Sequence, residues 1–287
     1  MKQIYVIGNG FDIDLGWHTS YKDFYLSKIK GWEMNKNEKD DLFQYVIRHT
    51  GENWYDFERT IYEYCLEKSK GDLNEDLMRR DLIDFRSFKS QLENFVKERS
   101  KEPVNRKSKA YEILKAFVEQ SSHTNTSDIR PQLFSFNYTP LGEVAKLIKP
   151  NMVFNYTAVH GTIEKNNCIF GFQDDINIKG DYRYMQKSLD DNYDSHGLLP
   201  TLMDARKITF FGLSMGPIDA VYFKDVFDMI STPGDFNHRK KMEIEFITKD
   251  AKSKRDIKLN LQSIGINIQS LMQNNKVTFT LTSDNNK

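Results

Sequence analysis

Cysteine is scarce in this sequence, with only Cys65 and Cys168 among its 287 residues. Two cysteines are too few for a disulfide framework or a four-cysteine zinc site, so we expect both thiols to be reduced and buried. Long apolar runs are also lacking, because none approaches the roughly 18 residues that a membrane span requires. These two absences predict a cytoplasmic protein with no membrane segment.

An excess of either charge is missing as well. Lys and Arg together number 41 and Asp and Glu together number 41, so the net charge is zero. No segment gathers the basic side chains that binding to a nucleic acid backbone requires, and we expect no nucleic acid partner. Asp56 and Glu58 are close in sequence, but with no His or Cys beside them we predict no metal site.

The first strand-like segment, residues 3–7, leads directly into Gly8-Asn9-Gly10-Phe11-Asp12, and a helix capped by Thr19 or Ser20 is expected to begin near Tyr21. A strand that ends in glycines often places bare backbone beside a nucleotide at the carboxyl edge of a parallel sheet. The alternative is a tight turn with positive φ at Gly8 or Gly10. The G-x-G-x-x-G fingerprint is incomplete, because Asp12 and Ile13 occupy the place of its last glycine.

Apolar spacings of three and four predict helices through most of residues 21–128, whereas strands and helices alternate after that. The alternation predicts an α/β fold, a Rossmann-like three-layer parallel sheet with a large helical insertion after the first strand. Residues 1–20 and 129–287 would form the nucleotide-binding core, and residues 21–128 the insertion. The later strands are expected at residues 133–137, 152–160, 168–172, 208–211, 242–248 and 277–281, with helices at 140–148, 182–189, 219–230 and 257–273.

Polar residues end the strands expected at 133–137 and 152–160. Asn137 can hold a water or a ribose hydroxyl without titrating, or it can cap the helix that opens at Pro140. His160 precedes Gly161, and its imidazole can deprotonate a water or a ribose hydroxyl near neutral pH. Because the carboxyl ends of parallel strands share one edge of the sheet, we expect Asn137 and His160 to be candidate catalytic residues there.

The segment Gly212-Leu213-Ser214-Met215-Gly216 follows another expected strand and fits two interpretations. One is a G-x-S-x-G nucleophile elbow, for which His238 is the only later histidine. The other is a ribose or phosphate contact by Gly212 and Ser214, with Asp219 near the start of the next helix. Little chain remains after Ser214 for the rest of a hydrolase sheet, so the second interpretation is favoured.

Several motifs together resemble those of the AbiH family of phage abortive-infection proteins, and they span most of the chain. The resemblance is carried by residues 8–12, Gly16, residues 19–24, 53–58 and 136–139, His160-Gly161, Gly212–Ser214, Asp219 and Tyr222-Phe223.

The order G-x-G, N-Y, H-G and G-x-S is also distantly similar to that of the sirtuin-like NAD-binding fold. That similarity implies that Asn137 and His160 act on the nicotinamide ribosyl bond of NAD and that Gly212 and Ser214 hold the adenosine half. Thr139 stands where the sirtuin-like motif has an aspartate, and a zinc-binding cysteine module is missing, so protein deacylation is not expected. The residues implied to line the cofactor are Gly8, Asn9, Gly10, Phe11, Asp12, Thr139, Gly212, Ser214 and Asp219.

The leading hypothesis is a phage-defence protein that binds NAD or a related nucleotide and hydrolyses the bond between nicotinamide and ribose. One alternative is a nucleotide-binding sensor without turnover, which the threonine at position 139 favours. Another is a serine hydrolase that uses Ser214. A homo-oligomer or a phage-derived trigger is the partner that the family resemblance implies.

Overall fold

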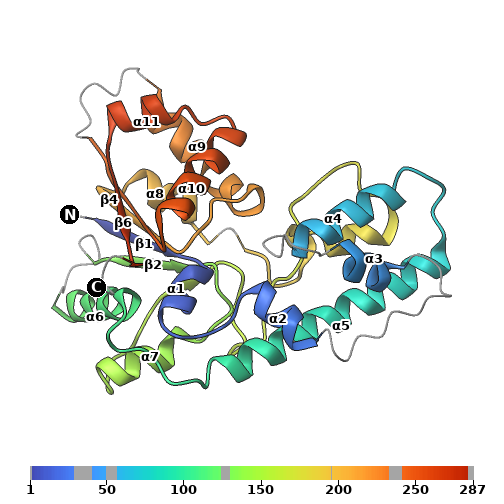
Figure 1. Ribbon diagram of the computed structural model, residues 1–287, viewed down its shortest axis with the longest axis horizontal. Helices are drawn as coiled ribbons and strands as arrows, with labels where there is room; N and C mark the ends of the chain where they lie inside the picture. The colour runs from blue at the N-terminus through green and yellow to red at the C-terminus, as the bar shows by residue number, and fades with distance from the viewer. Residues whose placement is uncertain are drawn as a thin grey trace. The chain divides into compact units, whose positions relative to one another are not determined.

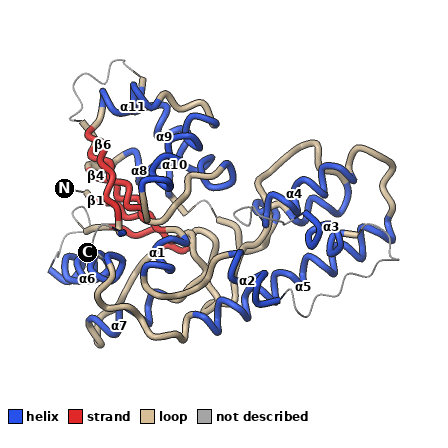
Figure 2. Tube along the Cα trace, viewed as in Figure 1, coloured by secondary structure: helices blue, strands red, loops and turns tan. Residues whose placement is uncertain are grey.

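The computed structural model describes residues 2–28, 41–49, 57–123, 130–194, 196–232 and 241–283. Trp54, Asp56 and His238 of the motifs above lie outside these residues. Six strands in the described part of the chain form one parallel sheet: β1 (Gln3–Ile7), β2 (Gln132–Ser135), β3 (Thr157–Ala158), β4 (Lys207–Phe211), β5 (Glu243–Thr248) and β6 (Lys276–Leu281). Their spatial order is β3-β2-β1-β4-β5-β6, with β1 near the centre (Figure 2).

Each face of the sheet carries its own apolar core, because successive strand side chains point to opposite faces. Ile4, Phe210 and Phe246 belong to one core, which the helices α8 (Leu198–Met203), α9 (Pro217–Ser231), α10 (Ala251–Ser263) and α11 (Ile268–Asn274) complete. Tyr5 and Phe211 belong to the other, with α1 (Asn9–Asp14), α6 (Lys109–His123) and α7 (Leu141–Ile148). Figure 1 shows these two groups of helices on opposite sides of the strands, which confirms the predicted Rossmann-like three-layer fold.

The chain divides into two compact units. The sheet unit comprises residues 1–17, 102–159 and 195–287, and the helical unit comprises residues 18–101 and 160–194. Helix α6 is in the sheet unit because its Leu114 and Phe117 are buried against the same core as Tyr5. The sequence-based boundaries assigned α6 to the insertion, since its helical periodicity does not reveal which partner its apolar side meets.

The helical unit contains α2 (Tyr21–Lys28), α3 (Leu42–His49), α4 (Phe57–Lys68) and α5 (Glu75–Arg99). As expected, Ser20 caps α2: its Oγ accepts the backbone N–H of Asp23 at 3.1 Å and donates to the Asp23 carboxylate. Asn74 caps α5 by accepting the N–H of Leu77 at 3.0 Å. These helices confirm the large helical insertion after the first strand.

Buried charges link α4 and α5 to the later segment of the helical unit. Asp81 of α5 is fully buried and accepts hydrogen bonds of 2.8 Å from the hydroxyls of Tyr64 and Tyr182. Glu58 of α4 forms a 2.9 Å ion pair with Lys187, and both side chains are almost completely buried. Buried carboxylates need partners of this kind to offset their lost hydration, so these contacts fix how the segment packs on the two helices.

Four expected elements differ in the structure. The strand expected over residues 152–160 is reduced to the two residues of β3. Residues 168–172 form no strand, only an isolated bridge from Phe172 to Gln186, because that segment packs in the helical unit rather than beside the sheet. The helix expected over 257–273 is broken into α10 and α11 around Gly265, whose φ is +92°. Residues 180–189 form two short 3-10 helices, Gly180–Met185 and Lys187–Leu189, in place of one α-helix.

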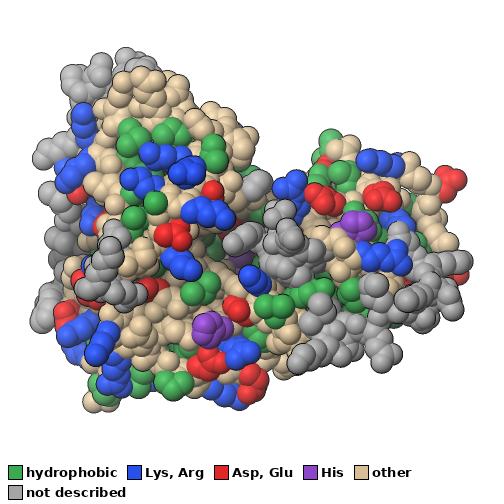
Figure 3. All heavy atoms as spheres, in the orientation of Figure 1, with side chains coloured by type: hydrophobic (Ala, Val, Ile, Leu, Met, Phe, Trp, Pro, Cys, Tyr) green, Lys and Arg blue, Asp and Glu red, His purple; other side chains and the backbone are tan. Residues whose placement is uncertain are grey.

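Acidic and basic side chains are interspersed on the surface in view (Figure 3), as the zero net charge leads one to expect. Among the described residues, no helix combines the length and apolarity needed to cross a membrane.

Candidate functional site

The candidate site lies where the strand order reverses. From β1 the chain order proceeds outward through β2 and β3 on one side and through β4, β5 and β6 on the other. Helix α1 follows β1 onto one face of the sheet, whereas α9 follows β4 onto the opposite face. In open α/β sheets, ligands bind beside the carboxyl ends of the strands at such a reversal. The segments that follow β1, β2 and β4 therefore meet at one edge, as the sequence predicted.

Three glycines bring the ends of β1 and β4 into direct backbone contact. The N–H of Gly8 donates to the carbonyl of Phe211 and that of Gly10 to the carbonyl of Gly212, both at 2.9 Å. A Cβ on Gly10 would lie 2.6 Å from the Cα of Gly212, and a Cβ on Gly212 would lie 2.3 Å from the backbone nitrogen of Phe11. The two backbones are therefore too close for any side chain at Gly10 or Gly212, whether or not a ligand binds here.

The alternative interpretation, a tight turn with positive φ at Gly8 or Gly10, is wrong. Gly8 has an extended φ of −129° and precedes α1, while Gly10 lies inside that helix. The left-handed residue is Gly212, whose φ is +69°. Gly8 and Gly10 are glycines because of their neighbour across the sheet edge, which a local sequence pattern does not reveal.

A buried polar cluster joins β1 to β2 at this edge. The side-chain nitrogen of Asn137 donates to the carbonyl of Gly8 at 2.9 Å and to the carboxylate of Asp12 at 2.8 Å. The hydroxyl of Thr139 donates to the same carboxylate at 2.9 Å. Asp12 and Thr139 are each 1% exposed and Asn137 is 7% exposed. Asp12 is therefore an internal support of this edge.

The cluster fixes the orientation of the Asn137 amide. Both of its partners are acceptors, so the NH₂ group must face them, and its two hydrogens are used. The amide oxygen, Oδ1, is left to accept a hydrogen bond from another group. Asn137 does not cap the following helix, because α7 begins after Pro140 without a side-chain cap. The ligand-binding interpretation of Asn137 stays a prediction.

The loop after β4 is the exposed part of the edge. The Ser214 hydroxyl accepts the N–H of Gly216 at 3.3 Å, and the Ser214 carbonyl accepts a 2.8 Å hydrogen bond from the side chain of Asn260. Besides Gly212, the residue with positive φ in this loop is Met215, at +53°, and Ser214 has no positive φ. A nucleophile elbow places its serine on the strained residue, so this backbone departs from that geometry. Asp219 lies in the first turn of α9 and is half-buried.

Phe11 and Asn9, two of the residues predicted to contact the ligand, differ in how far they are buried. The ring of Phe11 is fully buried and packs edge-on against Phe211 with centroids 5.2 Å apart, so it contributes to the core. Asn9, beside it, is half-buried at the start of α1.

His160 is the first residue of the second segment of the helical unit and is 4% exposed. Its carbonyl accepts the N–H of Ile169 at 2.8 Å. The pairing of His160 with Asn137 stays a prediction.

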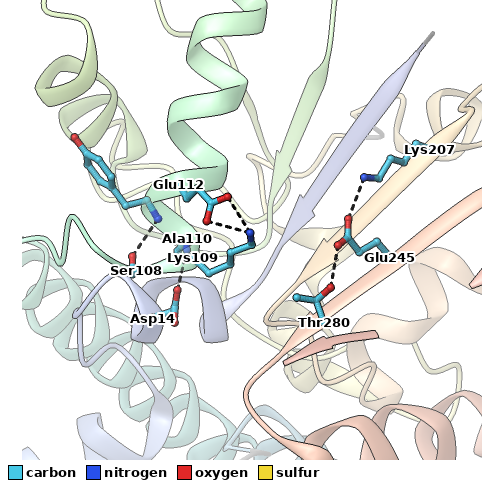
Figure 4. A network of polar contacts seen from close by, with 9 residues as sticks. Asp14, Ser108, Lys109, Ala110, Glu112, Lys207, Glu245 and Thr280 are labelled. Carbon is cyan, nitrogen blue, oxygen red and sulfur yellow. Dashed lines mark hydrogen bonds and ion pairs between the residues drawn. The ribbon is translucent and has the colours of Figure 1, made fainter. Parts of the chain in front are cut away.

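Helix α1 is anchored by polar contacts that the sequence did not reveal. The carboxylate of Asp14 accepts the N–H of Ala110 at 2.8 Å and so caps α6, as Figure 4 shows. Burial raises the pKa of Asp14, while hydrogen bonds from the backbone of Ala110 and Lys109 act in the opposite direction. This contact ties the helix that carries Gly10 and Asp12 to α6, which covers the same face of the sheet.

A second set of contacts in Figure 4 crosses β4, β5 and β6 on the same face of the sheet. Glu245 forms a 3.0 Å ion pair with Lys207 and accepts a 3.0 Å hydrogen bond from Thr280. Burial, and then the charge of Glu245, raises the pKa of Tyr5 to about 12. Tyr5 therefore stays neutral at physiological pH and contributes no charge beneath the site.

Within the described ranges, no group of three or more His, Cys, Asp or Glu side chains is placed to hold a metal ion. Glu58, one of the two acidic residues considered for a metal site, is paired with Lys187.

Comparison with known proteins identifies the family. A search of curated proteins returned no match. The family model described as bacteriophage abortive infection AbiH matches residues 4–235, which include the glycine segment, the Asn137 cluster, His160 and the Ser214 loop. Because the match covers most of the 287 residues, this chain belongs to the AbiH family of bacteriophage abortive infection proteins.

Proposed function

We propose that this abortive infection protein binds NAD or a related nucleotide at the carboxyl edge of its sheet and hydrolyses the bond between nicotinamide and ribose. The single observation that carries the proposal is the Asn137 amide, held by Asp12 and the Gly8 carbonyl at the reversal point of the strand order. Its oxygen is pre-oriented to accept a hydrogen bond from a ribose hydroxyl or a water.

The residues at this edge fit the ribose part of a nucleotide. Asn137 Oδ1 and the Ser214 hydroxyl are neutral polar groups, and Asp219 offers a carboxylate, which is a frequent partner of ribose hydroxyls. None of the nine residues implied to line the ligand is Lys or Arg. The N–H groups of Gly8 and Gly10 are used within the protein, so they do not support a pyrophosphate cradle like that of the G-x-G-x-x-G fingerprint. We therefore propose that the protein recognises the nucleotide through its ribose.

In the proposed reaction, water adds to C1′ of the ribose as the C–N bond to nicotinamide breaks, which yields ADP-ribose, nicotinamide and a proton. Asn137 would orient the water or the ribose, and His160 would accept the proton. Thr139 and Asp12 are positioning residues, because they act through the amide of Asn137. Loss of cellular NAD would stop phage replication in the cytoplasm. A phage-derived trigger or self-assembly would regulate the activity.

A nucleotide sensor without turnover is the second candidate. The observation that favours it is that Thr139 contributes only a hydroxyl, which is used on Asp12, where the sirtuin-like pattern has a carboxylate. Such a protein would use the same edge for binding, and it would lack nicotinamide release.

The test is nicotinamide release from NAD by the purified full chain, beside Asn137→Ala and His160→Ala. We expect each variant to lose about a hundredfold or more in turnover, the loss typical of removing a group that orients or deprotonates a reactant. Thr139→Val should lower turnover less, because the Asn137 amide keeps both of its own hydrogen bonds, to Gly8 and Asp12. Gly142→Ala is the matched control, since a Cβ at that position of α7 has no neighbour within 4 Å.

The outcomes separate the candidates. No release, combined with a rise in thermal midpoint with NAD that Asn137→Ala abolishes, supports the sensor. If NAD is neither cleaved nor stabilises the protein, both proposed uses of this edge are rejected. Labelling of Ser214 by a fluorophosphonate probe would instead indicate the serine hydrolase.

A further inference from the structure

The two edges of the sheet differ in how they are protected against a further strand. β3 and β6 are the outermost strands. β3 is only two residues long, and a very short edge strand is one way in which natural proteins limit pairing. β6 is six residues long, keeps a continuous register with β5 and contains no proline. All of its residues are at least partly exposed, so the described part of the chain leaves this edge accessible.

Charges do not protect β6 either. Its only charged residue, Lys276, lies at its first position and forms a 3.4 Å ion pair with Glu243 of β5. Edge lysines commonly deter a second strand, because pairing would bury their charge. Residues 277–283 carry no charge. A second strand can therefore lie along this segment without removing a charged side chain of β6 from water.

The backbone hydrogen bonds of β6 show which of its residues face outward. Lys276 and Thr282 each donate from the backbone N–H, at 2.9 Å, to a carbonyl of the β5 segment. The backbone groups of successive strand residues point alternately to the two sides, so the even-numbered residues of β6 face β5. The odd-numbered residues Val277, Phe279 and Leu281 therefore direct their N–H and C=O groups away from the sheet.

These three residues are complementary to a second copy of β6 in antiparallel orientation. A two-fold axis through Phe279 pairs this residue with its equivalent and pairs Val277 with Leu281 of the other copy. Each outward residue then exchanges hydrogen bonds with its partner, so all of the outward N–H and C=O groups are used. The side chains that meet on this face are apolar in every pair, and Thr278 meets Thr280 on the other face. Aromatic, aliphatic and threonine pairs of this kind stabilise neighbouring strands.

We propose that two copies of this chain associate by antiparallel pairing of their β6 strands, which joins their sheets into one continuous sheet. The partner is a second copy because the two-fold pairing satisfies every outward backbone group and places no charge of β6 opposite a like charge. One strand pair is a small interface, so we expect a dissociation constant of about 1–100 µM. This association does not depend on the proposed function, because none of the residues placed at the carboxyl edge lies in β6.

Two lysines beside Phe279 determine how salt affects this interface. The ammonium groups of Lys254 and Lys258 of α10 lie 5.1 and 5.4 Å from the centroid of the Phe279 ring. The two-fold axis brings the lysines of both copies near each other, and their like charges repel. Because salt screens exposed charges, we expect the dimer to become tighter between about 0.05 and 0.5 M NaCl. Association through opposite charges would weaken over the same range.

The first test is sedimentation equilibrium of the full chain, which we expect to show a monomer–dimer equilibrium. Val277→Pro removes an outward N–H and leaves the hydrogen bonds to β5 in place, so it should weaken dimerisation about tenfold or more. Val221→Ala is the control, because it removes an exposed apolar side chain from α9 and should dimerise as the parent does. The fluorescence of Trp17 reports whether each variant is folded.

Cysteine cross-linking with diamide as the oxidant tests the register. In the proposed pairing the two Cα atoms at position 279 are about 5.5 Å apart, which is within the disulfide range of about 4.4–6.8 Å. Phe279→Cys should therefore give a disulfide-linked dimer. Thr278→Cys is the matched control, because its two copies are diagonal neighbours roughly 7–8 Å apart and should cross-link at least tenfold more slowly. The buried Cys65 and Cys168 are common to both variants.

Several results would overturn the proposal. A chain that stays monomeric up to about 1 mM would reject self-pairing in favour of a strand from another protein. A dimer that persists unchanged in folded Val277→Pro would place the interface elsewhere. Equal cross-linking of Phe279→Cys and Thr278→Cys would reject the two-fold axis at Phe279, and a dimer that salt weakens would contradict the approach of the lysines. Each of these results is independent of whether NAD is bound or cleaved.

Discussion

Replacing Gly10 with alanine tests whether close backbone packing, rather than turn geometry, explains the glycine segment. The new methyl group would lie 2.6 Å from the Cα of Gly212 and 3.1 Å from its carbonyl oxygen, where ordinary contact begins at 3.4 Å. Both of these neighbours are backbone atoms, so no side-chain rotation relieves the clash. The ends of β1 and β4 would have to separate by most of an ångström.

The expected cost follows from the contacts that hold these ends together. Overpacking of this kind costs about 1–3 kcal/mol, and weakening the hydrogen bond from Gly10 to Gly212 adds about 1 kcal/mol. Alanine within a helix returns about 1 kcal/mol relative to glycine. We therefore expect Gly10→Ala to lower the free energy of unfolding by about 1–3 kcal/mol. Gly142→Ala, in open space on α7, should raise it by about 0.5–1 kcal/mol.

The assay is urea unfolding monitored by the fluorescence of Trp17, which is buried in the sheet unit. Replacing Trp32 and Trp54 with phenylalanine leaves Trp17 as the single tryptophan of the chain. With an m value of about 2 kcal/mol/M, the midpoint for Gly10→Ala should fall by about 0.5–1.5 M. A midpoint equal to or above that of the parent, with Gly142→Ala behaving as expected, would refute the packing explanation.

Three further predictions concern the helical unit. Lys187→Met should lower the free energy of unfolding by about 3–5 kcal/mol, because Glu58 stays buried without its partner. In urea unfolding, adding Glu58→Gln should restore part of that free energy, and a single variant as stable as the parent would contradict the reasoning. Burial and neighbouring carboxylates raise the pKa of Asp84 to about 6, so the native state loses stability as pH rises from about 4 to 6. Asp84→Asn should therefore raise the thermal midpoint at pH about 7 and leave it unchanged at pH about 3.5, whereas equal shifts would argue against this titration. Burial raises the pKa of Cys168 to about 12 and also raises that of Cys65, so iodoacetamide should modify neither thiol until urea unfolds the protein, and rapid labelling of the native chain would count against it.

Patterns local to the sequence predicted most strands and the fold class. The apolar run of residues 3–7 is β1, and the edge strand expected at 277–281 is β6. A strand buried on both faces is apolar throughout, and such runs are recognisable without a partner. Residues 168–172 have the same local character, yet they pack in the helical unit, because an apolar run does not specify what buries it.

The candidate site was predictable as a set of strand ends and unpredictable as a set of contacts. The G-x-G, Asn137 and G-x-S segments were expected at one edge because parallel strands end together. The sequence does not reveal that the Asp12 carboxylate accepts hydrogen bonds from Asn137 and Thr139, since those partners lie more than 120 residues away along the chain.

The sequence by itself determined the strands, the helical insertion and membership of the AbiH family, because periodicity and motifs are properties of neighbouring residues. Tertiary structure alone decided why Gly10 must be glycine, which atom of Asn137 is left to bind a ligand, and that α6 covers the sheet. Each of these depends on atoms that folding brings together from distant parts of the chain, and burial makes their hydrogen bonds obligatory.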